Sequence, residues 1–170
     1  MGTHAGPIVS MASSPARRVV ATCGGNDKEL KIWSYPAEDG MDQPVAFASE
    51  MSVKVSTFER PRSMAMHPFG FQVAVIMEDT LRVFHITTQQ ATRILFDLPL
   101  KHPGSVAYSN SGDLLAVTSS NDVILVDPWK GILVRMFSGS GGHLSFVNQV
   151  SFSADDKMLL SCSAAPSGAI

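Results

Sequence analysis

The sequence predicts an all-β chain that folds as part of a β-propeller with four-stranded antiparallel blades. Two observations support this prediction. Short apolar runs rich in Val, Ile and Leu alternate along the chain with turn residues such as Gly, Pro, Asn and Asp, a pattern typical of strands and hairpins. The pattern also repeats, because Ser14, His67, Ser109 and Ser153 each precede a tight turn, at spacings of 53, 42 and 44 residues. A period of this length indicates propeller blades.

Four repeats follow from this period within one incomplete propeller domain, residues 1–170. Their approximate ranges are 4–58, 59–99, 100–138 and 139–170, and the last is cut short. Each repeat begins with two strand-like runs joined by a turn at residues 15–18, 68–71, 110–113 or 154–157. Loops this short can join only antiparallel neighbours, so each repeat is predicted to be a meander.

The strands of each blade can be assigned in order. The first run mixes small and large residues, as expected where inner strands crowd around an axis, and the second is nearly all apolar, as in a strand covered on both faces. Third runs lie at 31–33, 81–84 and 123–127, and outer strands are predicted near 46–58, 92–98 and 132–137. The count is about three full blades plus part of a fourth.

Composition places the chain among globular proteins and limits the classes of partner that it is expected to bind. Its 170 residues are 45% hydrophobic and 16% charged, which is enough apolar material for one packed domain. The formal net charge of -2 provides no positive field for nucleic acid or anionic lipid, so no nucleic acid and no membrane is expected as a partner. No signal peptide and no bilayer-length apolar run is present, which indicates a cytoplasmic protein.

The two cysteines, Cys23 and Cys162, lie inside apolar runs without a paired spacing. We interpret both as small buried side chains in a reducing compartment. A disulfide between them is not expected.

Short motifs in a characteristic order carry a family resemblance. They are His-x-x-Pro-Ile at 4–8, Ala-Thr-Cys at 21–23, Leu-Lys-Ile-Trp at 30–33, His-Pro-x-Gly at 67–70, Asp-x-Leu-Arg at 79–82, Tyr-Ser-Asn-x-Gly at 108–112, Gly-His at 142–143 and Ala-Asp-Asp-x-x-Leu-x-Ser at 154–161. In this order the motifs resemble the WD-repeat propellers and, within them, the cilia- and flagella-associated WD-repeat proteins. The match extends over nearly the whole chain.

The resemblance implies a buried polar network that closes a blade: a His before the first strand, a hydroxyl on the second, an Asp in the next turn and a Trp on the third. The matching side chains are His4, Thr22, Asp27 and Trp33 in the first repeat, and His143 and Ser161 in the fourth. Cys23 is an alternative for the hydroxyl position. Buried polar groups need partners, so a complete network fixes the geometry of a blade. Its predicted role is structural.

The second and third repeats depart from this pattern. The second has Phe84 in place of Trp and no leading His, while the third has Val126 followed by Asp127 and no Gly-His. These blades are expected to rely on apolar packing, at about 1 kcal/mol less stability for each absent hydrogen bond.

Patterns that would indicate catalysis are lacking. The glycine-rich loop at 139–143 has neither the dinucleotide fingerprint nor a Gly-Lys-Ser/Thr sequence, so we interpret it as a connection between blades. The five histidines do not form a metal-ligand spacing, and no Gly-x-Ser-x-Gly elbow presents a nucleophile. No enzymatic activity, cofactor or metal is predicted.

Charged loops are the candidate partner-binding positions. The acidic loop carries Glu38, Asp39 and Asp42, and the basic positions are Arg60, Arg62 and Lys101. Insertions on a rigid scaffold often bind partners, and guanidinium groups suit acidic ones. The alternative for each is an ordinary solvated loop.

These observations predict a non-catalytic scaffold for protein–protein interactions. The resemblance implies a component of the ciliary or flagellar axoneme, part of the cytoskeleton, that docks or regulates inner dynein arms. Its partners would be axonemal or dynein-arm proteins and the rest of its own propeller in a longer chain. The alternatives are a signalling or ubiquitin-ligase adaptor and, from the enzyme class, a metal-dependent propeller hydrolase.

The repeat count also predicts a fragment. A seven-bladed ring at this period needs about 300 residues, more than the 170 present. Exposed strand edges would make the isolated chain poorly soluble.

Overall fold

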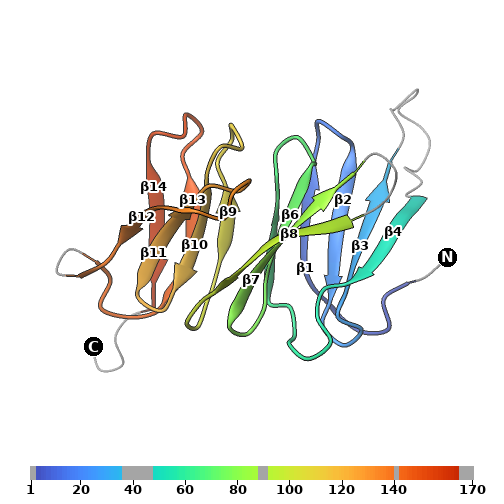
Figure 1. Ribbon diagram of the computed structural model, residues 1–170, viewed down its shortest axis with the longest axis horizontal. Helices are drawn as coiled ribbons and strands as arrows, with labels where there is room; N and C mark the ends of the chain where they lie inside the picture. Colours follow the sequence, from blue (N-terminus) through green and yellow to red (C-terminus); the bar gives the residue numbers. More distant parts are fainter. Residues whose placement is uncertain (1–2, 36–47, 88–91, 140–141, 165–170) are drawn as a thin grey trace.

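The computed structural model describes residues 3–35, 48–87, 92–139 and 142–164. Within them, fourteen strands form four antiparallel sheets, shown in Figure 1 in chain order from blue to red. The predicted all-β fold of three full four-stranded blades and one partial blade is confirmed. The four repeat ranges stay predictions.

Each sheet follows the order of the chain. Sheet 1 contains β1 (Ile8–Ser14), β2 (Val19–Gly24), β3 (Glu29–Ser34) and β4 (Ala48–Lys54). Sheet 2 contains β5 (Ser63–Met66), β6 (Gln72–Ile76), β7 (Thr80–Ile86) and β8 (Thr92–Pro99). Sheet 3 contains β9 (Val106–Tyr108), β10 (Leu115–Ser119), β11 (Asp122–Val126) and β12 (Leu133–Phe137). Sheet 4 contains β13 (Val147–Phe152) and β14 (Leu159–Ser163).

The first strands of neighbouring sheets lie together, because β1 contacts β5, β5 contacts β9 and β9 contacts β13. The turn after each first strand contains one residue with positive φ: Arg18, Gly70, Gly112 or Asp156. Such residues let the chain reverse within a few positions. In three of the turns this is the third of the four turn residues, and its N–H donates to the carbonyl of His67, Ser109 or Ser153. In the first turn it is the fourth residue, Arg18, whose N–H donates to Pro15 O.

The core consists of three apolar layers, each between two neighbouring sheets. Leu30 and Ile32 of sheet 1 pack with Phe84 of sheet 2. The next layer joins the opposite face of sheet 2 to sheet 3, and a smaller one joins sheet 3 to sheet 4. β6 is buried at all positions because both faces of sheet 2 are covered, which explains its almost continuous apolar sequence.

The two cysteines differ in burial. Cys23 is fully buried. Burial is the larger cause and the nearby Asp27 carboxylate the smaller one that together raise the pKa of its thiol to about 12, so the thiol is neutral. Cys162 is exposed, so the prediction of burial was wrong there. Among the described residues β14 pairs only with β13, and no further sheet covers the face that carries Cys162.

The part of the chain that the structure describes contains no helix long and apolar enough to cross a membrane.

Candidate functional site

The polar side chains assigned to the first blade meet in the structure. His4 precedes β1, Thr22 lies on β2, Asp27 in the turn after it and Trp33 on β3. His4 Nε2 lies 2.9 Å from Thr22 Oγ1, and His4 Nδ1 lies 2.8 Å from Asp27 Oδ2. The indole Nε1 of Trp33 donates to Thr22 Oγ1 at 2.8 Å. The Thr22 hydroxyl is thus the shared partner of an imidazole and an indole, while Cys23 takes no part.

The Asp27 carboxylate anchors this network to the backbone. It accepts from Ala5 N at 2.9 Å and from Glu29 N at 3.1 Å. Burial acts to raise the pKa of Asp27, but these hydrogen bonds and His4 outweigh it and hold the pKa below its usual value. A Cβ at Gly24 would overlap Asp27 Oδ1, so glycine permits this close approach. The side chains of the network are thus hydrogen-bonded to one another and to the backbone within sheet 1 and its flanking segments, as buried polar groups require.

Sheet 4 contains a related pair. His143 Nε2 lies 2.7 Å from Ser161 Oγ, and His143 Nδ1 lies 3.0 Å from Ser163 Oγ. Ser161 pairs with Val150 on β13, and Thr22 pairs with Met11 on β1. Val150 and Met11 each lie three residues before the last residue ahead of the turn, so the two pairs have the same register. Ser161 therefore occupies the structural position of Thr22.

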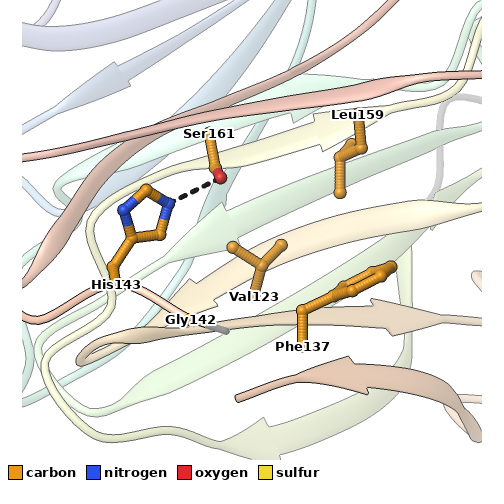
Figure 2. Close-up of a pocket in the computed structure, with 6 residues that line it drawn as sticks. All are labelled: Val123, Phe137, Gly142, His143, Leu159 and Ser161. Atoms are coloured by element: carbon orange, nitrogen blue, oxygen red, sulfur yellow. Dashed lines mark hydrogen bonds between the residues drawn. The ribbon is translucent and has the colours of Figure 1, made fainter. Parts of the chain in front are cut away.

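A cavity of about 250 Å³ lies beside this pair, between sheets 3 and 4. Figure 2 shows His143 and Ser161 on one side and Phe137 and Leu159 on the other. The cavity is lined by Val123, Phe137, Gly142, His143, Leu159 and Ser161. In sheet 1 the corresponding hydroxyl also accepts from the indole of Trp33, whereas among the described residues the side-chain partner of Ser161 Oγ is His143.

Sheet 3 closes with a different polar contact, which the sequence analysis missed. Thr118 Oγ1 accepts from Gly104 N at 2.8 Å and from Ser105 N at 2.9 Å. Thr118 is fully buried and lies one residue after Val117, the register counterpart of Thr22. Sheet 3 packs through apolar layers on both faces, as expected, but it also has this buried polar contact, which was not predicted. The signal in the sequence was the hydroxyl residue Thr118 in an apolar run, one position after the register counterpart of Thr22.

A second cavity, the inter-blade groove, lies between sheets 2 and 3 at the end where β8 leaves its sheet. Its volume is about 630 Å³. Its walls are formed by Asp79, Pro99, Leu100, Lys101, Ser119, Asp122, Ile124 and Met136. The hydroxyl of Ser119 fixes the adjoining loop by accepting from Lys101 N at 3.0 Å. The groove thus combines apolar and charged walls, as binding sites commonly do.

The predicted partner-binding positions do not form one site. Lys101 lines the inter-blade groove, whereas Arg60 and Arg62 are exposed before β5 and make no side-chain hydrogen bond or ion pair with other described residues. Glu38, Asp39 and Asp42 lie outside the described residues. Groups of three or more His, Cys, Asp or Glu side chains that could hold a metal ion are absent from the described ranges.

The opposite end of the molecule carries contacts between successive inner turns. Ser14 Oγ donates to Pro68 O at 2.5 Å, and Arg17 Nη1 donates to Gly70 O at 3.1 Å. Asn110 Nδ2 donates to Asp156 Oδ1 at 2.8 Å, which links sheets 3 and 4 in the same way.

His67 is a buried residue at the junction of sheets 2 and 3 on this end. Its ring packs edge-on against Tyr108, with centroids 5.3 Å apart, and a Cβ at Gly112 would overlap its Nε2. Burial lowers the pKa of His67 against the opposing effects of the Gly112 backbone and Asp113, which favours a neutral imidazole. His67 therefore acts as a packing element of the junction.

Comparisons with known proteins agree with this architecture. The WD40 family, described as "WD domain, G-beta repeat", matches residues 1–34 and 131–164. Among solved structures, the crystal structure of the Cps50 (Swd1) β-propeller domain from Myceliophteria thermophila superimposes with a TM-score of 0.72 at 15% identity. The superposition covers 96% of this chain and 50% of that chain, so it supports the fold of about half a propeller.

Two curated relatives are ciliary proteins of Tetrahymena thermophila. Cilia- and flagella-associated protein 57 C is 29% identical over 175 residues, which covers 94% of this chain and 12% of the relative. Cilia- and flagella-associated protein 57 A is 24% identical over 143 residues, which covers 83% of this chain and 10% of the relative. The chain thus spans only a small part of the length of the relatives it matches.

Proposed function

We propose that this chain, which matches the WD40 family over residues 1–34 and 131–164 and is similar to the cilia- and flagella-associated protein 57 proteins, is a non-catalytic interaction scaffold of the ciliary or flagellar axoneme. The observation that carries the proposal is the similarity to protein 57 C over 94% of the chain. The described polar side chains support it, because those of the first network are committed to blade closure rather than to a reaction.

The finer form of the proposal concerns the partners. The scaffold would bind axonemal or dynein-arm proteins and thereby help to dock or regulate inner dynein arms on the microtubule doublets. Packed sheets that present loops at both ends and a groove at one end suit this role, because binding residues concentrate where a stable framework positions them.

Localisation tests this proposal directly. An epitope-tagged form of the full polypeptide, expressed in ciliated cells, should remain with the axoneme after detergent removes the membrane and should co-purify with dynein-arm subunits. A tagged WD40 propeller from a non-ciliary complex is the control for nonspecific retention. Recovery of the tagged protein outside cilia, with ubiquitin-ligase or signalling subunits, would overturn the axonemal role.

We also propose that further strands of the same propeller complete sheet 4, with an indole in the cavity of Figure 2. The internal precedent is sheet 1, where Trp33 on β3 donates to Thr22 on β2. Ser161 occupies the position of Thr22, and β14 is paired on one side only among the described strands. An incoming strand would therefore find both a backbone edge and a side-chain acceptor.

A peptide with the sequence of residues 28–35, which contains β3, should bind the chain in trans. Its Trp33→Phe form should bind about five- to tenfold more weakly, the value of one net hydrogen bond. On a Ser161→Ala chain the two peptides should bind equally, because the acceptor is gone. Calorimetry measures all four affinities, and an undiminished Trp-to-Phe difference on the Ser161→Ala chain would contradict the assignment.

A further inference from the structure

The two complete junctions between sheets differ at one structurally equivalent position. Between sheets 1 and 2, Arg82 on β7 forms a bidentate pair with Asp97 on β8, with distances of 2.7 Å from Nε and 2.6 Å from Nη2. Arg82 Nη1 also donates to Val55 O, across the junction, at 2.6 Å. The Arg82 guanidinium thus links sheet 2 to the residue that follows β4 of sheet 1.

The same position between sheets 2 and 3 has no charged pair. In sheet 2, Arg82 on β7 pairs with Val75 on β6 and with Asp97 on β8. In sheet 3, Ile124 on β11 pairs in the same way with Val117 on β10 and with Met136 on β12. Ile124 is therefore the register counterpart of Arg82, and Met136 is the counterpart of Asp97. Leu100 is the counterpart of Val55, because Leu100 N donates to Asp79 O as Val55 N donates to Lys28 O. At the position that the Arg82 guanidinium occupies between sheets 1 and 2, the junction of sheets 2 and 3 contains the inter-blade groove, about 630 Å³ in volume.

The charges of the groove favour a cation. Asp79 and Asp122 both line it, and neither carboxylate has a hydrogen-bond or ion-pair partner among the described residues. Lys101 is the single cationic side chain lining it, so the described walls carry a net negative charge. A guanidinium suits such walls because its five donors can reach a carboxylate and a backbone carbonyl together, as Arg82 does.

The groove also continues onto an apolar strand edge. Met136 belongs to β12, which is exposed at all five positions and pairs only with β11 among the described strands. Ile132, Leu133 and Val134 are each more than half exposed. An extended segment could place alternate apolar side chains against this surface while its backbone meets the open edge.

We propose that the inter-blade groove binds an extended segment of a protein partner through an arginine, with apolar neighbours packed on Leu100, Ile124 and Met136. The aliphatic stem of the arginine would contact these side chains while its guanidinium meets Asp79 and Asp122. This proposal rests on the role of the chain as a protein-interaction scaffold and specifies the chemistry of one partner.

Fluorescence anisotropy with the full chain and a labelled peptide, Gly-Ser-Leu-Arg-Leu-Ser-Gly, tests the proposal. A second peptide with glutamine in place of arginine tests the need for the cation. The arginine peptide should bind, and the glutamine peptide should bind about tenfold more weakly. The Asp79→Asn/Asp122→Asn variant should lose about tenfold in affinity for the arginine peptide and little for the glutamine peptide.

Matched variants separate the groove from general charge effects. Glu78→Gln removes an exposed carboxylate beside the groove and should leave binding unchanged, whereas Asp79→Asn should weaken it. Ile124→Arg/Met136→Asp should recreate the Arg82–Asp97 pair within sheet 3 and abolish binding by filling the groove. Circular dichroism checks that each variant remains folded. If Ile124→Arg/Met136→Asp does not fold, Asp79→Asn still tests the groove, because Asp79 is exposed.

Equal binding of the two peptides, absence of binding by either, or equal effects of Glu78→Gln and Asp79→Asn would overturn the assignment. Failure of the axonemal role is distinguishable from these outcomes. A chain that binds the arginine peptide in the groove but is found outside cilia contradicts only the proposed function. A chain retained in axonemes, with the same partners before and after Asp79→Asn/Asp122→Asn, contradicts only the groove.

Discussion

Replacement of Thr22 by valine should lower the free energy of unfolding by about 3 kcal/mol, because one hydroxyl satisfies two buried groups. Thr22 Oγ1 pairs with His4 Nε2 and accepts from Trp33 Nε1. Valine keeps the shape of the side chain but leaves the imidazole and the indole without this partner. The cost of an unsatisfied buried polar group exceeds the gain from the hydrogen bond that is lost, so the effect is larger than the net value of two hydrogen bonds.

Denaturant unfolding followed by circular dichroism measures this change. The matched control is Thr92→Val on β8, since Thr92 has no side-chain hydrogen bond among the described residues. That replacement should change stability by less than about 0.5 kcal/mol. A similar small loss for Thr22→Val would mean that the first network contributes little to the stability of its blade.

Replacement of Gly112 by alanine should cost about 3 kcal/mol or more, the second large effect. Gly112 has a φ of +82°, a conformation that costs an L-residue roughly 1–2 kcal/mol. In addition, the new Cβ would overlap Nε2 of His67, which is 3% exposed and enclosed by Tyr108. The ring cannot move without disturbing the junction of sheets 2 and 3, because packed interiors leave little room for displacement.

Gly139→Ala isolates the backbone contribution in the same measurement. Gly139 has a φ of +81°, but a Cβ there would meet no atom within 4 Å. Its replacement should therefore cost only the roughly 1–2 kcal/mol of the backbone conformation. Equal losses for the two glycines would show that the contact with His67 does not add to the penalty.

Much of the fold was predictable because its signals are local. Strand and turn residues alternate at short range, and four turns at a regular spacing indicate blades. The outer strands were also located, since β8 and β12 begin within one residue of their expected positions. For the first network, the family resemblance implied side chains that the structure places within hydrogen-bond distance.

Other features depended on contacts between distant segments. Thr118 was missed because its partners are backbone amides of Gly104 and Ser105, which have no side-chain signature in the sequence. The exposure of Cys162 was missed because an apolar run does not show whether a neighbouring sheet covers it. The inter-blade groove was missed because a hollow results from the side chains of two sheets together.

The sequence by itself determined the all-β repeat architecture and the strand order within each sheet, because these follow from periodicity. The residues of the first polar network were expected from the family resemblance that the short motifs carry. The tertiary structure alone decided which faces are covered, how Thr118 closes sheet 3 and where a junction is left open. The reason is that neighbouring sheets meet through residues about forty positions apart. The positions that hold Arg82 and Asp97 in sheet 2 hold Ile124 and Met136 in sheet 3. This difference produces a groove only when sheets 2 and 3 are packed together.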